Sequence, residues 1–378
     1  MFPIPIVAPC LRCAAALPLM ALLWLLPLSL HAREQPSGAP AQGQGDLHGP
    51  YSSLDSGVLG ETQRYSVDLP KGYDAQKRYP VIYLLDGDSH RTKLLGVIEG
   101  LTDGLQPAMP SAIVVGLDGR KRMRDYTPTH TLKLPNGQPG SKAYKVTGGG
   151  ERFLDFIEQE LQAVIDADYA TSGVTILMGH SFGGLLALEA LRSDRAFNAV
   201  VAIDPSLWFD YPAYQQRLTK ESGLSGGRHS ALFIAASDNP FTPGLGLSSL
   251  HSELIRGLSD TLQQRASPDF AVRGQFYPGS DHSSVVLPAI EDSLRWLFEG
   301  YRIAYGAQGP DAETVIGNYR RLSRRLGAQI RPDRERLQFN WAYINTRLPE
   351  AQRSDLFEAL LKHYYPQLPV EPRGTMAH

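Results

Sequence analysis

The chain has almost no cysteine. Of its 378 residues only Cys10 and Cys13 are cysteines, and both lie just before an apolar run near the N-terminus. A segment of this kind is removed when it acts as a secretory signal, so the mature chain would contain no thiol. This excludes structural disulfides, a cysteine nucleophile and thiolate metal sites, and a redox or zinc role for the Cys-x-x-Cys spacing is not expected.

Charge of one sign is also lacking. The chain has 37 Lys and Arg against 39 Asp and Glu, a net charge of −2. No basic patch of the kind that binds nucleic acid follows from this composition, so we expect no nucleic-acid partner. The fractions of hydrophobic residues (42%) and charged residues (20%) are ordinary for a globular protein.

Only one long apolar run occurs, at residues 14–30. Arg12 precedes it, and Ala32 places a small residue at a cleavage position. We predict a cleaved signal peptide over residues 1–32 and a periplasmic or secreted protein. The alternative is an uncleaved membrane anchor, because the run approaches the length needed to span a bilayer. Residues 33–50, rich in Gly, Pro, Gln and Ala, predict a flexible linker.

A Gly-x-Ser-x-Gly motif follows a short apolar segment at residues 174–178. The motif runs Gly179-His180-Ser181-Phe182-Gly183 and leads into a helical pattern at residues 185–191. A strand, a sharp turn carrying serine and a helix together form a nucleophile elbow, so Ser181 is the predicted nucleophile. The same spacing recurs around Ser225, but no strand pattern precedes it, and we set that match aside.

Strand and helix patterns alternate between residues 51 and 301. Strands are predicted at 62–69, 81–85, 112–117, 174–178, 199–203, 231–236 and 271–277, and helices at 153–165, 185–191, 250–262 and 285–298. This order predicts an α/β-hydrolase fold, with a mainly parallel sheet covered by helices on both faces. Residues 302–378 predict a small helical extension and tail, with helices near 311–326, 332–347 and 349–364.

A serine hydroxyl needs a base, and the base needs an acid that orients it. In this fold the acid and then the histidine follow the nucleophile along the chain. His282 comes directly after the strand at 271–277 and is the predicted base. The acid is predicted to be Asp238, after the strand at 231–236. Asp204, after the strand at 199–203, and Glu253 remain open as alternatives.

The oxyanion hole should use two backbone N–H groups. One belongs to Phe182, directly after the nucleophile, and the other to Gly87 or Asp88, in the loop after the strand at 81–85. Asp86 and Asp88 together could suggest a metal site, but no histidine cluster supports them, so we expect no metal and no cofactor.

Five motifs in a fixed order carry a family resemblance. They are Tyr79 to Gly87 (YPVIYLLDG), Arg124 to Pro128 (RDYTP), Gly179 to Gly184 (GHSFGG), Pro205 to Trp208 (PSLW) and Asp281 to Val285 (DHSSV). With these motifs the chain resembles the putative-esterase family of α/β-hydrolases, which includes siderophore esterases and S-formylglutathione hydrolase. The resemblance covers about residues 50–301 and implies a Ser-His-acid esterase.

The resemblance also implies that Arg124 and Trp208 line the substrate pocket. The alternatives are a surface salt bridge for Arg124 and a core position for Trp208. The chain departs from the family at Asp204, where relatives often carry serine, and this keeps Asp204 open as an acid or a substrate contact. The C-terminal helices are similar to a tetratricopeptide-like extension, to which we assign no independent function.

The resulting hypothesis is an exported serine carboxylic-ester hydrolase that forms an acyl-enzyme, on siderophore-like or aromatic small-molecule esters. The alternatives are an acyltransferase on the same fold or a non-catalytic binding protein. Contact with a membrane is expected only through an uncleaved N-terminal segment, and the oligomeric state is not predicted. Because the base must be neutral, the rate should rise through the ordinary histidine range of pH.

Overall fold

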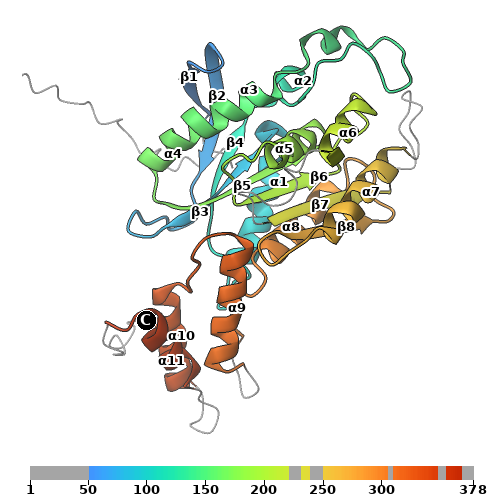
Figure 1. The fold of residues 1–378 in the computed structure, drawn as a ribbon. Helices are drawn as coiled ribbons and strands as arrows, with labels where there is room; N and C mark the ends of the chain where they lie inside the picture. Colours follow the sequence, from blue (N-terminus) through green and yellow to red (C-terminus); the bar gives the residue numbers. More distant parts are fainter. Residues whose placement is uncertain (1–50, 221–230, 239–249, 305–309, 348–354, 368–378) are drawn as a thin grey trace, which may run out of the picture. The chain divides into compact units, whose positions relative to one another are not determined.

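An eight-stranded sheet organises the part of the protein that the structure describes. The computed structural model describes residues 51–220, 231–238, 250–304, 310–347 and 355–367. The predicted signal peptide and linker, and the second Gly-x-Ser-x-Gly match, lie outside these residues. The sheet order is β1-β2-β4-β3-β5-β6-β7-β8 (Figure 1). The strands are β1 (Tyr51–Ser56), β2 (Glu61–Asp68), β3 (Tyr79–Leu84), β4 (Ile113–Leu117), β5 (Thr171–His180), β6 (Ala199–Ile203), β7 (Ala231–Ser237) and β8 (Ala271–Tyr277).

The sheet is parallel from β4 to β8, and β1 and β2 are antiparallel at its edge. Parallel strands end at the same edge, so the loops after β3, β5, β6, β7 and β8 meet there. The helices between and after the strands are α1 (Gly87–Thr102), α2 (Arg122–Asp125), α3 (Gly150–Phe156), α4 (Gln162–Asp168), α5 (Phe182–Arg192), α6 (Ala213–Lys220), α7 (Leu250–Gln264) and α8 (Val286–Leu297).

Helices cover both faces of the sheet, and the strand residues alternate between two apolar clusters. Val81 and Tyr83 of β3 belong to the cluster that contains α3, α5 and α7 side chains. Ile82 and Leu84 belong to the cluster that contains α1 and α8 side chains. Since side chains alternate along a strand, a continuously apolar strand is what two covered faces require.

The predicted fold class is confirmed. All seven predicted strands are present, with bounds within three residues of those expected. The elements that were not predicted include β1, which is polar and exposed; α1, in which Gly96 and Gly100 lower helix propensity; and α6, which is mostly polar. The helix predicted at 153–165 extends three residues further at each end, and a π-helical turn (Ile157–Leu161) joins its two parts, α3 and α4.

In the described part of the chain after Tyr301, the helices are α9 (Ala312–Arg325), α10 (Arg334–Arg347) and α11 (Leu356–Tyr364). Asp311 caps α9 by accepting a hydrogen bond from the Thr314 N–H at 2.7 Å. The predicted division of the chain near residue 301 stays a prediction. No helix among the described residues has the length and apolar character needed to cross a membrane.

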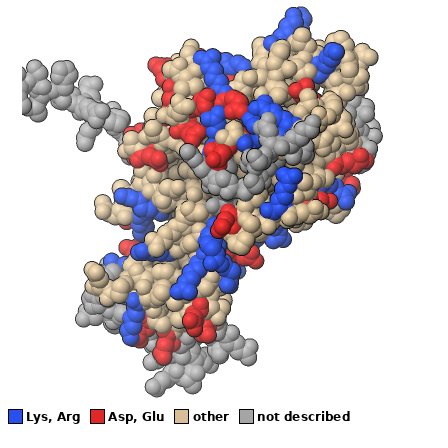
Figure 2. Space-filling model, viewed as in Figure 1, with Lys and Arg blue, Asp and Glu red and all other residues tan. Residues whose placement is uncertain are grey.

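Basic and acidic side chains are mixed over the face drawn in Figure 2, without a large field of one sign. On the helices α3 and α5 they form ion pairs with one another. Arg192, for example, pairs with Glu151 at 2.7 Å and with Glu189 at 2.6 Å. This surface agrees with the nearly balanced charge of the sequence.

Candidate active site

Ser181 lies at the turn between β5 and α5, as predicted. Its φ of 61° and ψ of −118° are unusual for a residue with a side chain. Such a conformation is typical of strained turns at functional sites. A Cβ on Gly179 would lie 2.3 Å from the Gly183 carbonyl group, so only glycine permits this close crossing of strand and helix. Local geometry therefore matches a nucleophile elbow.

The Ser181 backbone is fixed by the neighbouring strand, and its hydroxyl by a second serine. The Ser181 N–H donates to the Ile203 carbonyl at 3.0 Å, and the Ser206 N–H donates to the Ser181 carbonyl at 3.0 Å. The two hydroxyl oxygens, Ser181 Oγ and Ser206 Oγ, lie 3.1 Å apart. Ser206 was not predicted as a site residue, although it lies inside the Pro205–Trp208 motif.

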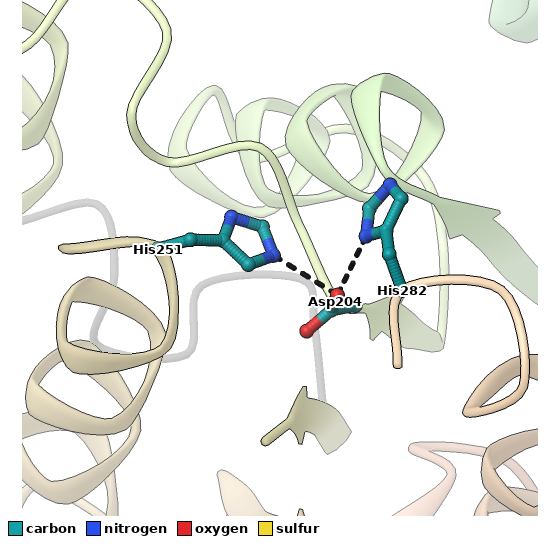
Figure 3. Close-up of side chains that lie close together, drawn as sticks. All are labelled: Asp204, His251 and His282. Atoms are coloured by element: carbon teal, nitrogen blue, oxygen red, sulfur yellow. Dashed lines mark hydrogen bonds and ion pairs between the residues drawn. The ribbon is translucent and has the colours of Figure 1, made fainter. Parts of the chain in front are cut away.

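His282 lies in the loop between β8 and α8, also at the carboxyl edge of the sheet. Its Nδ1 is 2.6 Å from Asp204 Oδ2, and its side chain is 34% exposed. Figure 3 shows the other ring nitrogen pointing away from Asp204. The described residues include no hydrogen bond between His282 and Ser181. Such a pair can still be catalytic, because the bond between nucleophile and base is often long without substrate.

The geometry does not support the first choice of acid, Asp238, and the identity of the acid stays a prediction. Asp204, not Asp238, contacts His282. Asp238 is exposed, and its carboxylate accepts a hydrogen bond from the Gly279 N–H at 3.3 Å. Glu253 is exposed on α7 and is likewise not bonded to His282 in the described part of the chain. The alternative that the sequence left open at Asp204 is the one that the geometry supports.

Asp204 is a fully buried carboxylate with a complete set of donors. Ser237 donates from its N–H to Oδ1 at 2.8 Å and from its hydroxyl to Oδ2 at 2.9 Å. His251 and His282 lie within hydrogen-bond distance of Oδ2. Burial by itself raises the pKa of Asp204, but the hydrogen bonds from both histidines and Ser237 outweigh it and hold that pKa well below its usual range. The carboxylate is therefore charged at every pH at which the protein would act.

His251 was not predicted to contribute. It lies in the first turn of α7, where it shares the buried face with Leu254, Ile255 and Leu258. Its Nε2 is 2.9 Å from Asp204 Oδ2 (Figure 3). The signal in the sequence was a histidine at helical spacing on an otherwise apolar stripe.

A third histidine holds the loop of His282. His180, just before the nucleophile, donates from Nε2 to the His282 carbonyl at 2.7 Å, and the centres of the two rings are 4.4 Å apart. Burial lowers the pKa of His180 to about 3, and the nearby rings of His282 and His90 add to the effect. A neutral His180 can therefore keep this hydrogen bond near neutral pH.

Two helix N-termini meet at the predicted oxyanion hole. The first N–H groups of α1, which begins at Gly87, and of α5, which begins at Phe182, have no partner within their helices. A Cβ on Gly183 would lie 3.2 Å from Leu85 Cβ, so the start of α5 lies against the end of β3. The predicted donors Gly87, Asp88 and Phe182 thus belong to adjacent segments, and their role stays a prediction.

Arg122, rather than Arg124, reaches the nucleophile elbow. Its guanidinium pairs with Asp86 at 3.0 and 3.2 Å and lies 5.4 Å from the Phe182 ring centre. Burial raises the pKa of Asp86, and Arg122 counteracts the shift. Arg124 forms ion pairs with Glu61 and Asp125. A salt bridge was the alternative to a position in the substrate pocket for this residue.

The two predicted pocket residues, Arg124 and Trp208, have different neighbours. Arg124 and Arg122 both line a cavity of about 380 Å³. Trp208 is half-buried, and its ring centre is 5.7 Å from that of Phe182. That Arg124 and Trp208 touch substrate stays a prediction.

Asp204, His251 and His282 also present three donor atoms within 4.8 Å of one another. Such a cluster has the composition of a metal site. Each of these atoms is instead paired with another member of the group, and Ser237 donates to both carboxylate oxygens. The hydrogen bonds account for the cluster, so we interpret it as a proton-bearing network. The carboxylates of Asp86 and Asp88 are likewise engaged, with Arg122 and with the Gly119 N–H.

Comparisons with known proteins show which family the chain is related to. The family profile described as putative esterase matches residues 56–240. The crystal structure of an IroE-like serine hydrolase from Shewanella oneidensis is 39% identical, with a TM-score of 0.76, and the match covers 83% of this chain and 99% of that one. The chain belongs to the putative-esterase family. It is a carboxylic ester hydrolase.

More distant relatives of this esterase have named substrates. Ferri-bacillibactin esterase BesA of Bacillus subtilis is 28% identical over 233 residues, which is 58% of this chain and 78% of BesA. The apo-salmochelin esterase of Escherichia coli is 26% identical over 244 residues, which is 58% of this chain and 73% of that protein. The resemblance inferred from the five sequence motifs is confirmed.

Proposed function

We propose that this esterase hydrolyses small-molecule carboxylic esters through an acyl-enzyme on Ser181, with His282 as the base and Asp204 as the acid. The observation that carries the proposal is the 2.6 Å contact between His282 Nδ1 and Asp204 Oδ2, beside a serine on a nucleophile elbow. The three residues then follow one another along the chain as nucleophile, acid and base (Ser181, Asp204, His282), which is the order typical of this fold.

In this mechanism Asp204 keeps the proton of His282 on Nδ1, which leaves Nε2 free to act as the base. His282 Nε2 removes the proton from Ser181 Oγ as that oxygen attacks the ester carbonyl. The same proton then passes to the leaving alcohol. Water repeats the two steps with the acyl-enzyme, which releases the acid and restores Ser181.

The negative charge on the attacked carbonyl oxygen would be stabilised by the N–H of Phe182 and that of Gly87 or Asp88. Both groups open helices, where unpaired N–H groups and the helix dipole favour negative charge. Donors fixed before the reaction contribute about 3–4 kcal/mol each in comparable enzymes.

For the substrate we propose a siderophore-like or aromatic ester. Two observations support this proposal. Relatives are named as esterases of ferri-bacillibactin, of apo-salmochelin and of the siderophore enterobactin, and aromatic rings contact Phe182, the residue after the nucleophile. Phe182 contacts Trp208 and Phe209, with ring centres 5.7 and 5.5 Å apart. We propose in addition that residues 1–32 direct export, so that the enzyme acts in the periplasm or outside the cell. Fractionation of cells that express the full chain tests that location.

The direct test is hydrolysis of acetyl and benzoyl nitrophenyl esters by the chain from Arg33 onward. Ser181→Ala should abolish turnover and labelling by a fluorophosphonate, and mass spectrometry should place the label on Ser181. Ser225→Ala is the matched control, since Ser225 lies in the same sequence motif, and it should retain full activity. Hydrolysis that survives in Ser181→Ala would refute the mechanism. If the wild type were labelled but turned over only with added alcohols, the activity would be that of an acyltransferase.

A further inference from the structure

The acid of the site is shared between two histidines. Asp204 Oδ2 lies 2.6 Å from His282 Nδ1 and 2.9 Å from His251 Nε2, and the two rings approach it from different elements (Figure 3). A Ser-His-Asp triad needs only one histidine on its carboxylate. The second histidine is therefore a feature that the proposed mechanism does not use.

The two histidines differ in what their other nitrogen can reach. His282 is 34% exposed at the edge of the sheet, whereas the side chain of His251 is 3% exposed. The Nδ1 atom of His251 is buried and has no hydrogen-bond partner in the described part of the chain. Since a base must exchange its proton with substrate, the buried His251 is not the base. Its hydrogen bond among the described residues is with Asp204.

The protonation of His251 follows from its partner. A carboxylate only accepts hydrogen bonds, so Nε2 of His251 must carry the proton. The buried Nδ1 of His251 then has a lone pair that accepts no hydrogen bond from the described residues, and this lowers the stability of the folded protein. A methyl-bearing side chain would avoid that cost at this apolar position, as Leu254 and Leu258 do on the same face of α7.

We propose that His251 is a positioning residue of this esterase, which donates from Nε2 to Asp204 Oδ2 and thereby fixes the carboxylate that orients His282. This inference rests on the proposed roles of Ser181, Asp204 and His282. In this proposal His251 does not contact the substrate.

The contact would have two effects. It holds Oδ2 in place together with Ser237, so that the carboxylate cannot rotate away from His282. It also withdraws charge from the oxygen that His282 uses, because hydrogen bonds to one acceptor compete for it. Without His251, Asp204 would attract the proton of His282 more strongly, so more of the base would be charged at a given pH.

The groups that act on the charge of His282 come from several elements. Asp204 follows β6, His251 lies on α7, and His180 ends β5. Among the described residues, His90 on α1 and Asp281 in the same loop as His282 also interact with His282. The test therefore changes His251 alone and leaves the other groups in place.

The experiment compares His251→Leu, His251→Gln and Leu258→Ala. Leucine removes the donor and keeps the bulk, and the Nε2 of glutamine can donate from nearly the same place. We expect His251→Leu to lower kcat by roughly 10- to 100-fold with little change in KM, and to move the acidic limb of kcat/KM to higher pH. His251→Gln should recover most of the loss. Leu258→Ala, a buried change on the same helix away from Asp204, should lower Tm and leave the pH profile unchanged.

A second readout does not depend on turnover. The proton on His282 Nδ1 should give a low-field resonance, identified by its loss in His282→Asn. His251→Leu should move that resonance further downfield, and His251→Gln should return it. In addition, His251→Leu should cost nothing further in an Asp204→Asn background, because His251 acts through Asp204.

An unchanged resonance together with a kcat within twofold of wild type in His251→Leu would overturn the proposal, and so would equal losses in His251→Leu and Leu258→Ala. If the proposed function itself were wrong, the experiments would give a different result. The wild type would then not hydrolyse any ester or react with the fluorophosphonate, while the displaced resonance would still report the coupling of His251 to His282 through Asp204.

Discussion

Replacement of Asp204 by asparagine should remove most of the catalytic power, whereas the same change at Asp238 should have little effect. Asparagine in place of Asp204 would keep the size of the side chain and lose its charge. In the wild type, both oxygens of the Asp204 carboxylate accept hydrogen bonds. The Ser237 N–H donates to Oδ1, and three further groups donate to Oδ2. The Ser237 N–H can only donate, so the amide oxygen should keep the Oδ1 place, whereas the Ser237 hydroxyl and both imidazoles can also accept. The amide NH₂ therefore takes the Oδ2 place and faces His282.

The size of the loss follows from the proton on His282. Opposite an amide NH₂, the His282 ring must present a lone pair from Nδ1, so its proton moves to Nε2. A protonated Nε2 cannot accept the proton of Ser181. Neutralising the corresponding carboxylate in serine proteases lowers kcat by roughly 10⁴-fold through this tautomer change, and we expect about 10³- to 10⁴-fold here. That range corresponds to about 4–5.5 kcal/mol of transition-state stabilisation.

Asp238→Asn is the control. Asp238 is exposed, and an asparagine oxygen can accept the same 3.3 Å hydrogen bond from the Gly279 N–H. Its kcat should stay within about twofold of wild type, as is usual for surface changes. Both variants are assayed on nitrophenyl acetate over a range of pH, after their Tm values show that they are folded. A large loss in Asp238→Asn with Asp204→Asn within tenfold of wild type would refute the assignment of the acid.

Three further outcomes are expected. Gly179→Ala should fail to fold or lose much of its Tm, since its Cβ would lie 2.3 Å from the Gly183 carbonyl group, whereas Gly257→Ala, with open space around its Cβ, should gain about 0.5–1 kcal/mol in thermal unfolding. In the unfolded chain His180 binds a proton below about pH 6.5, whereas in the folded protein, where its pKa is about 3, it stays neutral. The contribution of His180 should therefore lower the free energy of unfolding by about 2 kcal/mol from pH 7 to pH 5. Urea titrations of His180→Gln should show a smaller decrease over the same pH range. Trp208→Ala should raise KM for benzoyl esters several-fold more than for acetyl esters, and equal changes in both KM values would argue against a substrate contact.

The sequence predicted those parts of the site whose local pattern is sufficient. The turn at Ser181 needs glycines on both sides because strand and helix cross there, and that requirement is visible as a motif. His282 could be identified by its place after β8. Arg122 and Ser206 could not, because the directions of their side chains depend on the folded loops that carry them.

His251 shows a different limit. A single histidine on an apolar helical stripe is compatible with a buried core position, and nothing local indicates which group it contacts. Its partner, Asp204, is 47 residues away along the chain and lies on another element. Only the packing of α7 beside the ends of β6 and β7 brings the two together.

The choice between Asp204 and Asp238 turns on the direction of two side chains at neighbouring strand ends. Asp204 directly follows β6 with a φ of 44°, a left-handed conformation that aspartate tolerates better than most residues, and this turn directs its carboxylate into the protein. At the end of β7 it is Ser237, not Asp238, that faces this carboxylate and donates two hydrogen bonds to it. Asp238 lies one residue past the end of β7 and is exposed. Both aspartates match the position expected of the acid, so the decision lies in one backbone turn and in the register of β7, neither of which a strand pattern specifies to the residue.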